Sequence, residues 1–245
     1  MTQLHGRTAM VVGASRGLGR GVTEAFLAAG WRVVAVARDT GPLADLAARN
    51  PALRLESGDA SDPMLAGRLL EAHLPDVLAL IAGATPLLRP LHHHTWETFS
   101  LNWNSDTRMT FNWLREALLL PLRPGSRVIV MSSGAALQGS PLSGGYAGAK
   151  AAQRFMADYA AEESRRAGLG IAVLSVLPRL TPATELGRPA VAAYAARAGV
   201  SEAEYVAGMG EPVTPDVAGA AFVELAAGDA DAGAFLLTGG GLKPL

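Results

Sequence analysis

The chain has 245 residues, a formal net charge of -1 and no cysteine. It can therefore form no disulfide, no thiolate metal site and no cysteine nucleophile, and a cytoplasmic, reducing location is expected. The near-neutral charge disfavours a nucleic-acid partner, which usually requires a basic excess. The N-terminus lacks a basic region followed by an apolar stretch, and no run approaches the ~18 apolar residues of a membrane span, so we expect neither a signal peptide nor a membrane partner.

Short, continuous apolar runs recur along the chain, with helix-like segments between them. Runs without period-2 alternation are typical of strands buried on both faces of a parallel sheet. The intervening segments carry apolar residues at helical spacing and are long enough to cross between parallel strands. The pattern predicts one α/β domain over residues 1–245, a Rossmann-type doubly wound parallel β-sheet flanked by helices. The expected strands are 9–12, 33–37, 77–82, 128–131 and 171–177.

Residues 181–215 interrupt this rhythm with prolines and two short helical patterns, at 190–197 and 202–209. Long excursions from a compact domain are usually functional, so this segment is expected to be a substrate lid. A surface helical insertion is the alternative, and the sequence gives the two equal weight.

A glycine-rich turn joins the first expected strand to the first helix. A helix N-terminus at the carboxyl edge of a parallel sheet offers free N–H groups to a phosphate, and glycines let the backbone approach it. A tight turn without a ligand is the plainer alternative. The residues expected to bind a dinucleotide here are Gly13, Ser15, Arg16, Gly17, Leu18 and Gly19.

The same turn also fits the pattern G-x-S-x-G, centred on Ser15, of a serine hydrolase. That fold requires an acid and then a histidine after the nucleophile, whereas all five histidines lie at or before position 94. A Walker loop is excluded because neither lysine follows a glycine at the required spacing. A dinucleotide is therefore the favoured ligand.

The charge near the second expected strand bears on which dinucleotide binds. Arginines there accommodate a 2′-phosphate, whereas a carboxylate binds a free ribose 2′-hydroxyl. Arg16 in the turn and Arg38 after the strand favour NADP(H) over NAD(H). Asp39 is an alternative ribose ligand or a neutralising neighbour of Arg38, and Arg38 could also be an ordinary solvated charge.

Tyr146 and Lys150 are four residues apart, so they share one face of an expected helix. Lowering a tyrosine pKa from about 10 to 7 requires roughly 4 kcal/mol. An ammonium about 5 Å away supplies roughly 3 kcal/mol at an effective dielectric of ~20. Ser133, at the end of the fifth expected strand, can polarise a carbonyl oxygen. A lone Tyr-x-x-x-Lys is common on surface helices, but here it follows Ser133 and a dinucleotide turn.

With these motifs the chain resembles the short-chain dehydrogenase/reductase family, in its shorter single-domain branch. The resemblance implies that Tyr146 is the general acid/base, that Lys150 lowers the Tyr146 pKa and binds the nicotinamide ribose, and that Ser133 orients the substrate oxygen. It also implies a relay asparagine, for which counting back from the fifth strand favours Asn104 over Asn102. The residues that carry the resemblance are 13–19, Asp59, Ala82-Gly83, Ser133, Tyr146 to Lys150, Pro178 and Thr238-Gly239-Gly240.

The resemblance extends to cofactor contacts at Asp59, Ala82, Gly83 and Pro178, with three departures. Leu80 and Ile81 stand where the family usually has two asparagines, and Thr238 replaces an aspartate. Arg179 replaces a glycine after Pro178 and could bind an acidic substrate group or a cofactor phosphate, or face solvent.

These observations predict an NADP(H)-dependent oxidoreductase that interconverts a secondary alcohol and a ketone or aldehyde. A non-catalytic NADP(H)-binding sensor or structural subunit of the same fold is the alternative, and an epimerase or dehydratase would need a longer substrate domain. The adjacent histidines 92–94 point different ways, so no metal is expected. By resemblance the chain is a homo-oligomer, a tetramer or dimer, with the helix around Gly148 close to another subunit.

Overall fold

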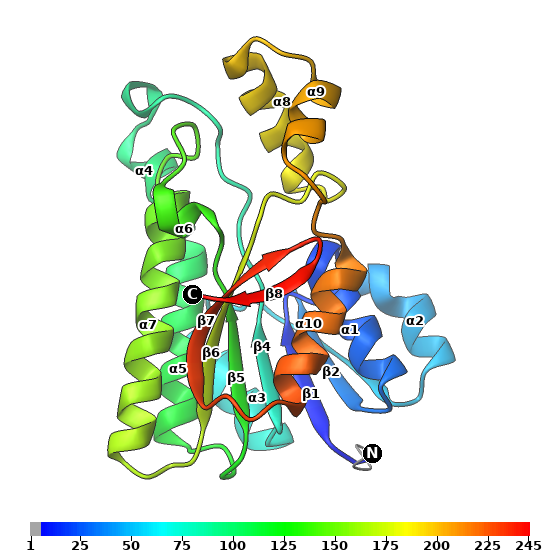
Figure 1. The fold of residues 1–245 in the computed structure, drawn as a ribbon. Helices are drawn as coiled ribbons and strands as arrows, with labels where there is room; N and C mark the ends of the chain where they lie inside the picture. The colour runs from blue at the N-terminus through cyan, green and yellow to red at the C-terminus, as the bar shows by residue number, and fades with distance from the viewer. Residues whose placement is uncertain (1–5) are drawn as a thin grey trace.

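The parallel strands assemble into one sheet, in the order β3-β2-β1-β4-β5-β6-β7-β8 (Figure 1). The computed structural model describes residues 6–245. His5 and the other residues at the start of the N-terminal segment, where no signal peptide is expected, lie outside the described residues. Within that part of the chain the strands are parallel except β8, which pairs antiparallel with β7. Their bounds are β1 Thr8–Val12, β2 Arg32–Ala37, β3 Leu53–Ser57, β4 Val77–Leu80, β5 Arg127–Met131, β6 Ala172–Pro178, β7 Ala232–Thr238 and β8 Gly241–Pro244.

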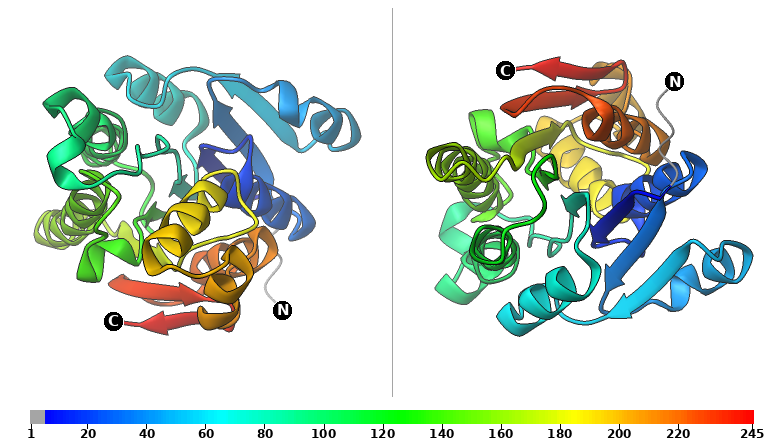
Figure 2. Two further views of the ribbon diagram at one scale, coloured as in Figure 1. Left: turned by 90° about the horizontal axis from the view of Figure 1, so that it is seen from above. Right: turned by 90° about the horizontal axis from the view of Figure 1, so that it is seen from below.

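Helices cover both faces of the sheet, as the views along the strands show (Figure 2), so the predicted doubly wound α/β fold is confirmed. One face carries α1 Gly17–Ala28, α2 Ala44–Arg49 and α10 Pro215–Ala227, and the other carries α3 Pro63–His73, α5 Arg108–Leu119 and α7 Tyr146–Arg166. No helix in residues 6–245 combines the length and the apolar character that crossing a bilayer requires.

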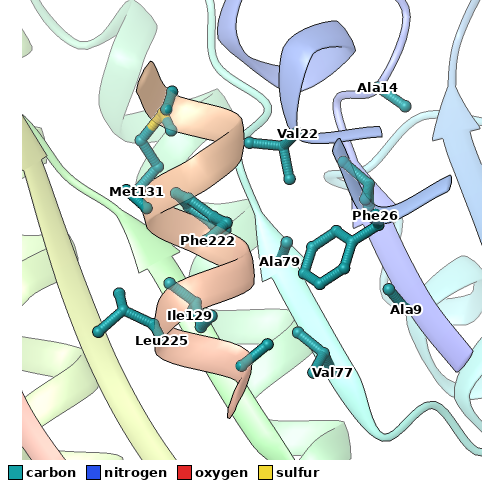
Figure 3. Packing of buried hydrophobic residues seen from close by; sticks show 14 of the residues in the cluster. Ala9, Ala14, Val22, Phe26, Val77, Ala79, Ile129, Met131, Phe222 and Leu225 are labelled. Carbon is teal, nitrogen blue, oxygen red and sulfur yellow. The ribbon is translucent and has the colours of Figure 1, made fainter. Parts of the chain in front are cut away.

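The core consists of two apolar layers, one on each face of the sheet. Alternate residues of a strand point to opposite faces, so Val11 packs under α1 and α10 while Val12 packs under α3, α5 and α7. In the first layer, Phe26 of α1 and Phe222 of α10 are fully buried over the strands (Figure 3). Burial on both faces explains why the central strands are continuous apolar runs.

Shorter elements lie at the carboxyl edge of the sheet, where the strands end. The segment 181–215 rises above this edge and contains α8 Gly187–Ala198 and α9 Glu202–Gly208 (Figure 1). Two short helices, α4 Trp96–Phe99 and α6 Ala135–Gln138, lie on the α5 and α7 side, together with a π-helical turn, η3, at Trp103–Thr107. These segments surround the ends of the strands.

Candidate active site

A cavity of about 1290 Å³ opens at the carboxyl ends of the strands. Its walls come from the glycine-rich turn, the ends of β2, β4, β5 and β6, the start of α7 and the 181–215 segment. The cavity brings together every residue expected at the site except Asn104. Those lining it are Gly13, Ser15, Arg16, Gly17, Leu18, Gly19, Arg38, Asp59, Ala82, Gly83, Ser133, Tyr146, Lys150 and Pro178.

The glycine-rich turn packs against the end of β4 at backbone contact. Gly13 has a φ of +96°, and a Cβ there would lie 2.5 Å from the Ala82 nitrogen. A Cβ on Gly19 would lie 2.0 Å from the Gly13 carbonyl oxygen. No side chain caps the N-terminus of α1, and its first turn holds no acidic residue. The unpaired N–H groups at this helix start therefore suit an anionic group such as a pyrophosphate.

Charged groups at the end of β2 leave one guanidinium exposed to the cavity. Asp39 Oδ1 accepts a hydrogen bond from the Gly41 N–H at 2.8 Å, so this carboxylate is used in its own turn. Arg38 is exposed and makes no ion pair within 4 Å among residues 6–245. The Arg16 guanidinium instead donates to Glu185 Oε2 at 2.9 Å. Arg38 is thus the arginine at the end of β2 that lines the cavity without an ion pair, while Arg16 is paired with Glu185 of the 181–215 segment.

Asp59 lines the same cavity as Arg38, whose charge acts on it. Its carboxylate accepts hydrogen bonds from the N–H and hydroxyl of Ser61, both at 2.9 Å. The Ser61 N–H hydrogen bond lowers the Asp59 pKa most; burial opposes it, and the charges of Arg38 and Arg108 lower the pKa further. This carboxylate is therefore held ionised and in a fixed position at the cavity wall.

Tyr146 and Lys150 occupy the first turns of α7, directly beyond β5. The Lys150 ammonium nitrogen lies 5.5 Å from the centre of the Tyr146 ring. Ser132 Oγ donates to the Lys150 carbonyl oxygen at 2.7 Å and so ties α7 to the end of β5. Ser133, one residue further along, lines the cavity and accepts from the Ala135 N–H at 3.2 Å. A hydroxyl, a phenol and an ammonium thus meet in one cavity.

Lys150 forms a buried ion pair that the sequence motifs do not predict. Its Nζ lies 3.1 Å from Asp106 Oδ2, and the two side chains are 5% and 0% exposed. Burial alone would lower the Lys150 pKa, but the charges of Asp106 and Tyr146 and the hydrogen bond to Asp106 outweigh it, so the pKa is raised. The ammonium therefore stays protonated although it is buried.

The structure does not bring Asn104 into the site, contrary to the expected relay position. Its side chain is exposed and donates to Ser100 Oγ at 3.2 Å. Asn102 is buried, where it donates to the Ala84 carbonyl at 2.8 Å. The reason is the π-helical turn η3, whose wider spacing rotates the following side chains around the helix. Asp106, rather than either asparagine, consequently faces Lys150.

The departures from the family pattern have identifiable surroundings. Leu80 is fully buried beneath α3 and α5, and Ile81 packs on the opposite face and borders the cavity, so apolar packing replaces polar bracing. Arg179 is exposed at the cavity rim. A Cβ on Gly148 would lie 3.1 Å from the Trp103 ring of the same chain. Within the chain, the close neighbour of Gly148 is therefore Trp103, and the contact expected with another subunit stays a prediction.

The 181–215 segment contributes both polar and apolar groups to the cavity. Tyr194 of α8 and Tyr205 of α9 stack with ring centres 6.4 Å apart, and the Tyr194 hydroxyl contacts Ser140 Oγ.

The three adjacent histidines do not share one position. His92 and His93 are exposed, whereas the His94 Nδ1 contacts Thr98 Oγ1 at 3.1 Å. Nowhere in residues 6–245 do three or more histidine, aspartate or glutamate side chains gather as a metal site would require.

A doubly wound sheet with a glycine-rich turn and a Tyr-x-x-x-Lys helix at one edge defines a Rossmann-type nucleotide-binding class of protein. The sequence profile of the family described as short chain dehydrogenase matches residues 7–195. The chain therefore belongs to this family of oxidoreductases.

Individual relatives agree with this assignment. The chain is 34% identical to the L-xylulose reductase of Mesocricetus auratus over 105 residues, which is 43% of each chain. It is 30% identical over 203 residues to a short chain dehydrogenase of Pseudocercospora fijiensis, covering 76% of this chain and 63% of the relative. The match to the xylulose reductase thus spans less than half of that protein's length.

A similar solved structure is that of a 3-oxoacyl (acyl-carrier-protein) reductase from Agrobacterium tumefaciens C58 with NADP bound. The two share 26% sequence identity and a TM-score of 0.80, over 96% of this chain and 94% of the other. The likeness extends over the whole sheet and its flanking helices.

Proposed function

We propose that this protein is an NADP(H)-dependent oxidoreductase that interconverts a secondary alcohol and a ketone or aldehyde. The observation that carries the proposal is the meeting of Ser133, Tyr146 and Lys150 in the cavity that begins at the glycine-rich turn. A protein that only bound nucleotide would have no need of this set. The reductase relatives and the NADP-bound similar structure support the same reaction class.

The residues present fit a nicotinamide dinucleotide. The uncapped start of α1 would receive the pyrophosphate, and Asp59 would lie at the adenine. Arg38 would pair with a 2′-phosphate, which favours NADP(H) over NAD(H). Lys150 would donate to the nicotinamide ribose, with Ala82, Gly83 and Pro178 forming the adjacent wall. When bound, the cofactor supplies or accepts the hydride.

The protein's own groups handle the proton and the substrate oxygen. Ser133 donates a hydrogen bond to the carbonyl oxygen and stabilises the negative charge that develops there. Tyr146 gives its phenolic proton to that oxygen in the reducing direction and takes it back in the oxidising direction. The Lys150 ammonium, 5.5 Å from the Tyr146 ring, stabilises the phenolate that forms in reduction.

The substrate end of the cavity has mainly apolar walls. Leu88, Leu137 and Leu186 face it, with Gln138 and Arg179 as its polar anchors. Because Tyr194 and Tyr205 of the 181–215 segment also border it, this segment acts as a substrate lid in our proposal. A hydrophobic ketone is the substrate class that fits such walls best.

The decisive experiment replaces Tyr146 by Phe. A panel of aromatic ketones, α-diketones and ketoses is screened with NADPH, following the loss of its absorbance. Turnover by the wild type should fall at least a thousandfold in Y146F, while NADPH binding stays within a few-fold. Full activity of Y146F would refute the assignment.

The second candidate, an NADP(H)-binding sensor of the same fold, draws on Leu80 and Ile81, which replace polar residues beside the cofactor loop. It would bind NADPH without oxidising it against any member of the panel. The same screen therefore separates the two functions.

A further inference from the structure

Asp106 is held in place by its surroundings independently of Lys150. Its Oδ1 accepts hydrogen bonds from the Ala84 N–H at 2.8 Å and from the Ser105 hydroxyl at 2.6 Å. Its Oδ2 lies 3.4 Å from the Asn102 amide nitrogen. The carboxylate is therefore fixed between the loop after β4 and the turn η3. Its Oδ2 also faces the ammonium of Lys150, at 3.1 Å.

The loop after β4 fits closely against this carboxylate. A Cβ on Gly83 would lie 2.7 Å from Asp106 Oδ2, so only glycine leaves room for it. Leu80 and Ile81 leave this loop without the polar side chains that usually brace it in the family. The hydrogen bond from the Ala84 N–H to Asp106 instead connects this loop to the turn η3.

Lys150 needs a counter-charge because its ammonium is almost entirely removed from solvent. An isolated buried ammonium loses its proton readily. The titratable groups that act on it are Asp106 from η3 and Tyr146 from α7, while Ser132, directly after β5, contacts only its backbone. Of these groups, Asp106 alone can be negative while Tyr146 still carries the proton needed for reduction.

From this geometry we propose that Asp106 is a positioning residue, which holds the Lys150 ammonium charged and in place for the nicotinamide ribose. This role rests on the proposed function in one respect, namely that Lys150 binds the nicotinamide ribose of the proposed cofactor. It differs from a relay asparagine because an amide carries no charge, whereas Asp106 neutralises the ammonium that it orients.

The composition of the chain makes Lys150 directly observable. The sequence contains two lysines, Lys150 and Lys243, and Lys243 is exposed. In an NMR spectrum, protein labelled with ¹³C at the lysine Cε should therefore give two lysine signals. The K243R variant removes the Lys243 signal and so identifies the signal of Lys150. Neither cofactor nor substrate is needed, so this test can fail while the Y146F test succeeds, or the reverse.

In the wild type, the Lys150 signal should remain in its protonated position at the pH where Lys243 is half titrated. In D106N the titration midpoint of Lys150 should fall by at least one unit, a tenfold loss of proton affinity, while Lys243 is unchanged. D106E, which keeps the charge, should restore most of the difference. D158N, on the exposed face of α7, is the matched control and should leave both midpoints unaltered.

A Lys150 midpoint that is unchanged in D106N would overturn the proposal. If D106N does not fold, the comparison of the Lys150 and Lys243 titration midpoints in the wild type still tests the proposal. Lys150 titrating below Lys243 would then show that Asp106 does not hold the ammonium charged.

Discussion

The guanidinium of Arg16, in the glycine-rich turn, donates to the carboxylate of Glu185, in the 181–215 segment, at 2.9 Å. Both side chains are largely exposed, at 58% and 71%, so the pair itself stabilises little. Its position matters more, because the 2′-phosphate that distinguishes NADPH from NADH would compete with Glu185 for Arg16. In the proposed function the pair would therefore couple cofactor binding to the position of the 181–215 segment.

Replacing Glu185 by Gln should release Arg16 for the cofactor. We expect NADPH affinity to rise about two- to fivefold, in keeping with an exposed pair worth up to about 1 kcal/mol. NADH affinity should change less. Intrinsic fluorescence titrations measure both, and E162Q, which removes an exposed pair with Arg165 on α7, is the control. An equal gain for both cofactors would contradict the coupling.

Arg38 offers a sharper test of cofactor choice, because it lines the cavity and makes no ion pair among residues 6–245. A charge-assisted hydrogen bond to a phosphate contributes about 1.5–3 kcal/mol. R38A should therefore weaken NADPH binding roughly ten- to a hundredfold and NADH binding much less. R49A, an exposed arginine on α2, should affect neither. Equal losses for NADPH and NADH in R38A would rule out the phosphate contact.

Gly83 and Gly208 form a matched pair for testing the packing beneath the cofactor loop. A Cβ on Gly83 collides with the buried Asp106 carboxylate, so G83A should lower the free energy of unfolding by about 1–3 kcal/mol. Nothing lies within 4 Å of a Cβ on Gly208 at the end of α9. G208A should thus be neutral or gain up to about 1 kcal/mol. Urea unfolding measures both, and equal losses would contradict the close packing at Gly83.

Much of this arrangement follows from local sequence. The central strands are continuous apolar runs because both faces of the sheet are covered, and Tyr146 and Lys150 meet because four residues make one helical turn. Strand β3 was not expected, since Arg54 and Glu56 interrupt its apolar pattern at the sheet edge. The last strands, β7 and β8, were not expected either.

Asp106 illustrates the limit of reasoning from spacing. Counting residues along a regular helix favours Asn104, but the π-helical turn at Trp103–Thr107 changes the facing of the side chains. That turn forms where Trp103 packs against Gly145, which precedes α7, and Gly148 in its first turn, a contact between segments far apart in the chain. No local pattern indicates such a contact, so the partner of Lys150 becomes visible only in the folded structure.

The edge of the sheet also predicts a pH dependence of stability. Burial raises the pKa of Glu56, but hydrogen bonds and charge from Arg54 and His73 outweigh it, so the pKa lies below the usual 4.5. A carboxyl with a depressed pKa contributes stability above its unfolded value and loses it as the pH falls through the folded value. E56Q should therefore reduce the difference in unfolding free energy between pH 7 and pH 3. E71Q on exposed α3 surface is the control, and an unchanged difference in E56Q would refute the role of Glu56.

The expected homo-oligomer can be tested on α7, the helix that contains Gly148. Further along α7, Phe155 and Tyr159 are 67% and 60% exposed with ring centres 5.9 Å apart. Grouped exposed aromatic side chains are unusual on a monomer and are typical of protein interfaces. F155E should therefore lower the apparent mass in size-exclusion chromatography with light scattering, because a carboxylate buried in an apolar interface lacks a partner. R154A, one residue away, is the control, and an F155E protein of wild-type mass would place any interface elsewhere.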